Sequence, residues 1–254
     1  MRQQIAAANW KMNLSLSETQ QLIEDLLCQS INLQDHQQMI VAVPYIYLLN
    51  IQNQLKDIPH FFVSAQNVSA NNNGAFTGEI SAAMLRGIGI QYVIIGHSER
   101  REYYHETPAL LVEKLNRAFE YDLTPIFCCG EPLQIREAST QNNYVTDQLK
   151  ASLFHLNEDQ IGRIIISYEP IWAIGTGKTA SSEQAQEMHA HIRNVIASKY
   201  GNEIAQKISV LYGGSVKASN AKELFAKPDI DGGLVGGASL NAIEFAAIVN
   251  SLKK

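Results

Sequence analysis

The sequence is poor in cysteine and has no excess of positive charge. Its three cysteines, Cys28, Cys128 and Cys129, form no CxxC pair. An odd number without that spacing argues against a disulfide framework and indicates a reducing, cytoplasmic setting. The 20 Lys and Arg residues against 25 Asp and Glu give a net charge of −5. A surface for nucleic acid or anionic membrane needs clustered Lys and Arg, so neither partner is expected.

Long apolar runs and metal-binding clusters are also missing. No stretch approaches the length of a membrane span, and the apolar run in MRQQIAAANW is too short for a signal peptide. His189 and His191 are two positions apart on a predicted helix, hence on different faces, and make poor joint ligands. Neither a metal nor an organic cofactor is predicted.

Two nucleotide-binding patterns are absent. The stretch EPIWAIGTGKT, residues 169–179, ends like a P-loop, but Trp172 stands where the first glycine of GxxxxGK[ST] belongs. An indole cannot replace the backbone nest that holds phosphates, so ATP is not the predicted ligand. The first strand-like run also lacks a GxGxxG turn, which argues against a dinucleotide-binding fold.

What the chain does contain is one unit, repeated: a short β-branched run, a turn and an amphipathic segment. The strand-like runs cover residues 4–10, 39–44, 60–65, 92–96, 124–130, 163–170, 207–214 and 229–237. Helical i, i+3, i+4 periodicity follows each run. Capping-box pairs precede two of these helices, Ser15 with Glu18 and Ser181 with Gln184.

Strands that are apolar on both faces and alternate with helices predict a parallel sheet covered on both sides. Eight such units in about 250 residues is the number found in a closed (β/α)8 TIM barrel. We therefore predict an α/β protein in which residues 1–254 form a single barrel domain. An open, doubly wound sheet is the alternative, and no linker-like segment divides the chain.

The barrel hypothesis places catalytic groups at the carboxyl ends of strands, where the βα loops converge. Four side chains capable of acid, base or electrophilic chemistry occupy such ends: Asn9, Lys11, His97 and Glu169. A random Glu is more often a surface ion-pair partner, and a lone His is more often a core residue. Four such groups at strand ends favour an active site instead.

Six segments of the sequence resemble those of a known family. The segments NWKMN, GAFTGEIS, GHSERR, YEPIWAIGTGKT, YGGSV and DGGLVGGASL are similar, in order, to the signature segments of the triosephosphate isomerases. The resemblance implies interconversion of dihydroxyacetone phosphate and D-glyceraldehyde 3-phosphate through an enediolate, in glycolysis and gluconeogenesis. Small departures, such as Ser167 in place of a usual alanine, lie beside the motifs and affect packing.

The resemblance also implies a role for each candidate. Glu169 is the expected base, in the stiff and partly apolar setting made by Pro170 and Trp172. His97 is expected to polarise the substrate carbonyl as a neutral ring, because a short helix begins just after it. Lys11 and Asn9 are expected to supply positive potential where the enediolate charge develops, and Glu99 is expected to orient Lys11 or His97.

The glycine-rich segments are the predicted phosphate grip. Backbone N–H groups near Ser215, Gly236 and Gly237 are expected to hold the phosphate, the latter two at a helix N-terminus. The segment AIGTGK is interpreted as a lid, with Gly175 giving an N–H to the phosphate and Lys178 at one hinge. Glycines alone fit ordinary tight turns equally well.

The segment from Gln66 to Glu79 is long for a βα connection and carries Phe76 and Thr77. By resemblance, it inserts beside a neighbouring subunit's active site in a homodimer; a surface excursion of a monomer is the alternative. Two other functions stay open, an aldolase with a Schiff-base lysine and a non-catalytic phosphate-binding barrel.

Overall fold

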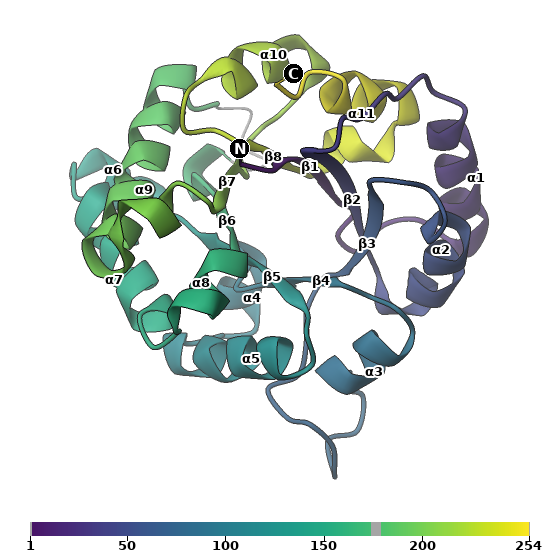
Figure 1. The fold of residues 1–254 in the computed structure, drawn as a ribbon, viewed down its shortest axis with the longest axis horizontal. Helices are drawn as coiled ribbons and strands as arrows, with labels where there is room; N and C mark the ends of the chain where they lie inside the picture. Colours follow the sequence, from purple (N-terminus) through teal and green to yellow (C-terminus); the bar gives the residue numbers. More distant parts are fainter. Residues whose placement is uncertain (1, 174–178, 254) are drawn as a thin grey trace.

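The computed structural model describes residues 2–173 and 179–253, and they contain a closed barrel of parallel strands surrounded by helices (Figure 1). Each strand pairs with the next along the chain, and the last pairs with the first. The strands are β1 (Gln4–Asn9), β2 (Gln37–Val43), β3 (Phe61–Ala65), β4 (Tyr92–Ile95), β5 (Thr124–Cys129), β6 (Ile165–Tyr168), β7 (Ser209–Tyr212) and β8 (Gly232–Val235). The predicted (β/α)8 barrel is confirmed.

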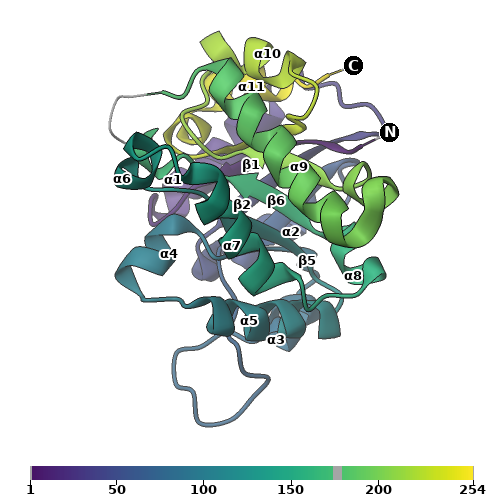
Figure 2. The same ribbon diagram turned by 90° about the vertical axis from the view of Figure 1, so that its left-hand side faces the viewer.

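The helices lie outside the barrel and return the chain to the start of the next strand (Figures 1 and 2). The α-helices are α1 (Leu16–Leu27), α2 (Leu48–Leu55), α3 (Ala82–Gly87), α4 (Ser98–Tyr103), α5 (Pro108–Glu120), α6 (Leu133–Glu137), α7 (Gln141–Leu153), α8 (Glu158–Arg163), α9 (Ser182–Ala205), α10 (Ala218–Ala226) and α11 (Ala242–Val249). Three 3₁₀ helices are η1 (Tyr45–Tyr47), η2 (Ile171–Ala173) and η3 (Gly237–Leu240). No helix in the described ranges is long and apolar enough to cross a membrane.

Two apolar layers hold the barrel together, because successive strand side chains point to opposite faces. One layer fills the barrel interior with residues such as Ile5, Ile40 and Leu211. The larger layer packs the outer strand faces, such as Met39 and Val41, against the helices. Strands buried on both faces read as continuous apolar runs, which is why the sequence identifies them.

The predicted capping boxes form at the starts of α1 and α9. The Ser15 hydroxyl accepts from the Glu18 N–H while the Glu18 carboxylate accepts from the Ser15 N–H, and Ser181 and Gln184 do the same. Each box satisfies donors that a helix start leaves without partners. Each box therefore fixes the residue at which its helix begins, Leu16 for α1 and Ser182 for α9.

The barrel closes where β8 meets β1, with Ile5 to Ala8 paired against Gly232 to Val235. Gly232 has a φ of +124°, and a side chain there would collide with the backbone of Ile5. Only glycine fits this close approach of two strands. The first glycine of β8 is thus a requirement of closure.

The connection between β3 and α3 projects away from the barrel (Figures 1 and 2). The Ser69 N–H donates to the Ile80 carbonyl at 2.8 Å and closes the base of this loop. The Asn72 amide donates to the Glu120 carboxylate at 3.1 Å and ties one side to the end of α5. The tip is exposed and carries Phe76, whose side chain is 46% exposed.

Candidate active site

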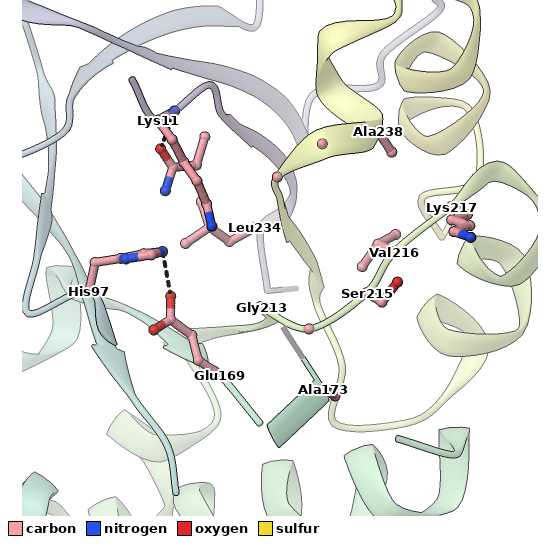
Figure 3. Close-up of a pocket in the computed structure, with 14 residues that line it drawn as sticks. Lys11, His97, Glu169, Ala173, Gly213, Ser215, Val216, Lys217, Leu234 and Ala238 are labelled. Carbon is pink, nitrogen blue, oxygen red and sulfur yellow. Dashed lines mark hydrogen bonds and ion pairs between the residues drawn. The ribbon is translucent and has the colours of Figure 1, made fainter. Parts of the chain in front are cut away.

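A cavity of about 420 Å³ opens at the carboxyl ends of the strands (Figure 3). Seven of the sequence-predicted site residues line it, from the end of β1 and the segments that follow β1, β4, β6, β7 and β8: Asn9, Lys11, His97, Glu169, Ser215, Gly236 and Gly237. The eighth, Gly175, lies outside the described residues, as does Lys178. Residues spread over most of the chain thus meet in one pocket.

Glu169 follows β6, and its side chain is 2% exposed. The Ser98 N–H donates to Oε2 at 2.9 Å, and Oε1 lies 3.2 Å from Nε2 of His97. The Glu169 N–H donates to the Cys129 carbonyl at 2.7 Å and fixes the backbone below the carboxylate. A buried carboxylate held by two donors on one edge has a defined orientation toward the cavity.

His97 is the N-cap of α4, which begins at Ser98 as the sequence predicts. Its Nδ1 accepts from the Glu99 N–H at 3.3 Å. This hydrogen bond requires an unprotonated Nδ1, so a neutral ring carries its proton on Nε2. Nε2 faces Glu169 across the cavity wall, as Figure 3 shows. The ring therefore presents a donor, not an acceptor, to the pocket.

Lys11 and Asn9 form the wall that follows β1. Lys11 has a φ of +53°, a left-handed conformation that is uncommon for a side chain of this size. The Asn9 Oδ1 accepts from the Lys11 N–H at 3.1 Å and from the Gln66 amide at 3.4 Å. Backbone strain of this kind persists where surrounding contacts hold it in place. Here it turns the lysine side chain over the pocket.

The Lys11 ammonium forms an ion pair with Glu99, its Nζ lying 2.6 Å from Oε1. The other Glu99 oxygen lies 3.6 Å from Nδ1 of His97. One carboxylate therefore contacts both polar groups, and it is 40% exposed at the edge of the pocket. Lys11 also passes Gly236, whose added Cβ would lie 3.7 Å from its Cε.

Gly213, directly after β7, leaves the room that Glu169 occupies. A Cβ on Gly213 would lie 2.8 Å from Cγ of Glu169 and 2.7 Å from Oγ of Ser167. Cβ atoms essentially never approach this closely, so both side chains would have to move. The Gly213 N–H donates to the Tyr168 carbonyl at 2.7 Å, which keeps the two strand ends together. The position of Glu169 thus requires a residue without a side chain at the first glycine of YGGS.

The opposite side of the pocket presents backbone donors. The N–H groups of Ser215, Gly236 and Gly237 have no acceptor among the described residues. Gly236 caps η3, so these last two donors begin a 3₁₀ helix; the α-helix expected directly after β8 starts only at Ala242. The helix prediction needs that correction, because Gly237 to Leu240 make a tighter turn first. The donors still point out of a helix start.

Buried polar groups support the base from below. The Glu131 carboxylate accepts from the Tyr168 hydroxyl at 3.0 Å and from the Trp172 indole at 2.9 Å. Burial raises the pKa of Glu131 above its ordinary value. Burial and the neighbouring Glu169 charge also raise the pKa of the Cys128 thiol well above its usual range. The end of β5 and the turn after it therefore place two buried polar groups beside the base, and Glu131 ties this turn to Tyr168 and Trp172.

The sequence did not select several residues that line the same cavity. These are Ala173, Gly213, Gly214, Val216, Lys217, Leu234 and Ala238. Leu234 points into the barrel from β8, a position that strand alternation would have identified once the register was known. Across the two described ranges, no three His, Cys, Asp or Glu side chains are placed to hold a metal ion.

Comparison with known proteins identifies the family. A sequence model of the family described as triosephosphate isomerase matches residues 4–252. The triosephosphate isomerase of Flavobacterium johnsoniae is 49% identical over 252 residues, covering 99% of this chain and 100% of the relative. That of Bacteroides fragilis (strain ATCC 25285) is 50% identical over 251 residues, 99% of each chain, and that of Cytophaga hutchinsonii is 50% identical over 258 residues, 99% of this chain and 100% of the relative. The chain belongs to the triosephosphate isomerase family.

Proposed function

We propose that Glu169 is the base of the isomerisation of dihydroxyacetone phosphate to D-glyceraldehyde 3-phosphate, the reaction of this family. The carboxylate takes the proton from the hydroxylated carbon, negative charge develops on the carbonyl oxygen, and the proton returns to the neighbouring carbon. The hydroxyl proton passes to the former carbonyl oxygen, so that the hydroxy-ketone becomes a hydroxy-aldehyde. The observation that supports this role is a buried carboxylate, held on one edge, that lines the cavity. A glutamate base with a neutral histidine is the arrangement for which this family is the standard example.

His97 and Lys11 stabilise the enediolate in this scheme. Nε2–H of His97, which lies 3.2 Å from Glu169 in the structure, turns to the developing oxyanion when substrate binds, and the Lys11 ammonium adds positive potential beside it. Asn9 positions Lys11 through the bond to its N–H. Donors that are already oriented stabilise charge without having to reorganise during the reaction.

The phosphate occupies the side of the cavity formed by Ser215, Gly236 and Gly237. Their N–H groups, free of acceptors among the described residues, form a set of donors suited to a dianion. Gly175 is assigned to the same ligand by family resemblance, from a segment outside the described residues. This division puts the phosphate on one side of the cavity and the reacting carbons beside Glu169.

The decisive test is isomerisation by wild type, Glu169→Asp and Glu169→Gln. Loss of a positioned general base costs about 10² to 10⁴ in rate, and we expect kcat to fall by at least that factor in Glu169→Gln. Glu102→Gln is the matched control, because Glu102 is an exposed glutamate on α4 outside the pocket. Equal activity in the Glu169 variants would mean that another group is the base.

We also propose that the chain forms a homodimer through the loop around Phe76 and Thr77. Four consecutive strands are each followed by large, exposed apolar side chains. Their exposed fractions are Met12 96%, Ile46 80%, Phe76 46%, Tyr103 66% and Tyr104 66%. Because consecutive strands are neighbours in the barrel, these side chains gather on one sector of the molecule. Exposed apolar side chains on one sector indicate a protein interface, and in a symmetric dimer the same sector of each subunit would be covered.

Sedimentation velocity of Ile46→Asp and Ile243→Asp tests this interface. Ile243 is 71% exposed on α11, which follows β8. We expect wild type and Ile243→Asp to sediment as dimers and Ile46→Asp to shift toward monomer. A monomeric wild type, or an Ile46→Asp variant that stays dimeric, would contradict the proposed surface.

The cytoplasm is the compartment we propose for this reaction. Cys28, Cys128 and Cys129 are all free thiols, two of them buried. Free thiols persist where the surroundings are reducing.

A further inference from the structure

We propose that Lys217 is a steering residue for the anionic substrate, a role distinct from the contacts that hold the phosphate. It follows β7 by five positions and lines the cavity just before α10. Figure 3 shows it beyond Ser215, on the side of the pocket away from His97 and Glu169. Its side chain is exposed, and its ammonium has no ion-pair partner among the described residues.

The charges around the pocket explain why this cation matters. Lys11 is neutralised by Glu99, with Nζ and Oε1 2.6 Å apart. Glu169 contributes a negative charge to the wall. Glu244 adds another at the start of α10, where its Oε1 accepts from the Ala218 N–H at 2.8 Å. Without Lys217, the described charges at this mouth leave a net excess of negative charge facing a dianion.

The whole chain adds to this problem, because its net charge is −5. Charges farther away than about 10 Å are screened at 0.1 M salt, so only local groups set the potential that an approaching substrate meets. Lys217 is the one described cation on the pocket wall that is not already in an ion pair. It therefore halves the excess of negative charge that an approaching dianion meets on the phosphate side of the entrance.

Steering raises the rate at which enzyme and substrate meet. In this family kcat/KM reaches the diffusional limit, so a change in that rate appears directly in kcat/KM. For a dianion passing within about 10 Å of one unit charge in water, Coulomb attraction gives an enhancement of about threefold at 0.01 M salt. Reversing the charge doubles the exponent and gives about eightfold. Screening reduces both effects to less than about twofold at 0.3 M salt.

The test rests on the isomerase activity and measures kcat/KM for D-glyceraldehyde 3-phosphate between 0.01 and 0.3 M salt. The variants are Lys217→Gln, Lys217→Glu and Lys150→Gln. Lys150 is an exposed lysine in the last turn of α7, and its replacement changes the net charge equally. We expect kcat/KM at 0.01 M salt to fall about threefold in Lys217→Gln and about eightfold in Lys217→Glu, with kcat unchanged. Lys150→Gln should match the wild type.

Two results would overturn the proposal. If Lys217→Gln and Lys150→Gln show the same salt dependence, the position of the charge is irrelevant. If the deficit of Lys217→Gln persists at 0.3 M salt, or kcat falls, the ammonium contacts the substrate directly and does not steer it. An inactive wild type would instead contradict the proposed reaction, so the two failures are distinguishable.

Discussion

At the scale of single residues, the site depends on small side chains as much as on reactive ones. Asn9, Lys11, His97 and Glu169 are predictable because reactive side chains at the ends of apolar strands are rare. The sequence also suggests Glu99 as a partner of Lys11 or His97, because it lies two residues after His97. That one carboxylate contacts both side chains depends on how α4 lies over the end of β1, which no local pattern encodes.

Gly213→Ala is expected to lower kcat by about 10²-fold, because the new methyl group would displace Glu169 and a displacement of about 1 Å has that effect. Steady-state kinetics measures the loss. Gly162→Ala is the control: a Cβ at this helical position meets nothing within 4 Å, and we expect full activity with a slightly higher melting temperature. An active Gly213→Ala variant would show that the loop accommodates the methyl group without moving the base.

His189 is expected to make the folded state sensitive to acid. Burial lowers the pKa of His189 to about 3, whereas an unfolded histidine titrates near 6.5. Between these values the unfolded chain binds more protons, so the free energy of unfolding falls as pH drops below about 6.5. The slope is up to about 1 kcal/mol per pH unit.

Urea titrations of His189→Asn and of the surface control His105→Asn between pH 4 and 7 measure this slope. We expect His189→Asn to show a shallower decline than wild type, and His105→Asn to follow wild type. Parallel curves for all three proteins would assign the acid sensitivity to other groups.

At the scale of elements, periodicity predicted which segments become strands and helices, because each buries a distinct face. The connections between these elements were harder to predict from the sequence. The turn after β8 was predicted as the start of an α-helix, but GGASL forms η3 first, since two glycines carry no preference for either helix.

Replacing Asp231, just before β8, by asparagine is expected to lower the free energy of unfolding more than the same change at Asp122. The buried Asp231 carboxylate accepts from Arg2 at 2.7 Å, Arg193 at 2.9 Å and the Val210 N–H at 3.0 Å, joining the N-terminus, α9 and β7. Asp231→Asn leaves a buried arginine without its full charge partner, which destabilises proteins by about 3 to 5 kcal/mol. Asp122 also meets two arginines but is 62% exposed, so Asp122→Asn should cost less than about 1 kcal/mol. Equal unfolding free energies for the two variants would contradict this ranking.

At the scale of the whole molecule, the number of repeats was enough to predict a closed barrel, because eight parallel units leave no free edge. The pocket volume and the apolar sector after β1 to β4 were not predictable, since both depend on how loops from distant segments pack together. The dimer prediction came from family resemblance, and the exposed side chains now supply a physical reason for it.

We propose that residues 1–254 fold as one domain, and the two tryptophans provide the test. Trp10 follows β1 and Trp172 lies in η2, so they report on opposite halves of the chain. In each single-tryptophan variant, we expect the fluorescence and circular dichroism transitions to coincide. A fluorescence midpoint that separates from the circular dichroism midpoint in either variant would reveal two folding units.

The pairing of β8 with β1 has a consequence for synthesis. Ile5 to Ala8 are translated 227 residues before their partners Gly232 to Val235 (232 − 5 = 227). At about 5 to 20 residues per second, β1 waits more than about ten seconds with one edge uncovered. An apolar strand with open N–H and C=O groups is a template for pairing with other nascent chains. The closure that removes every free edge from the finished barrel thus leaves β1 open to such pairing for as long as synthesis lasts.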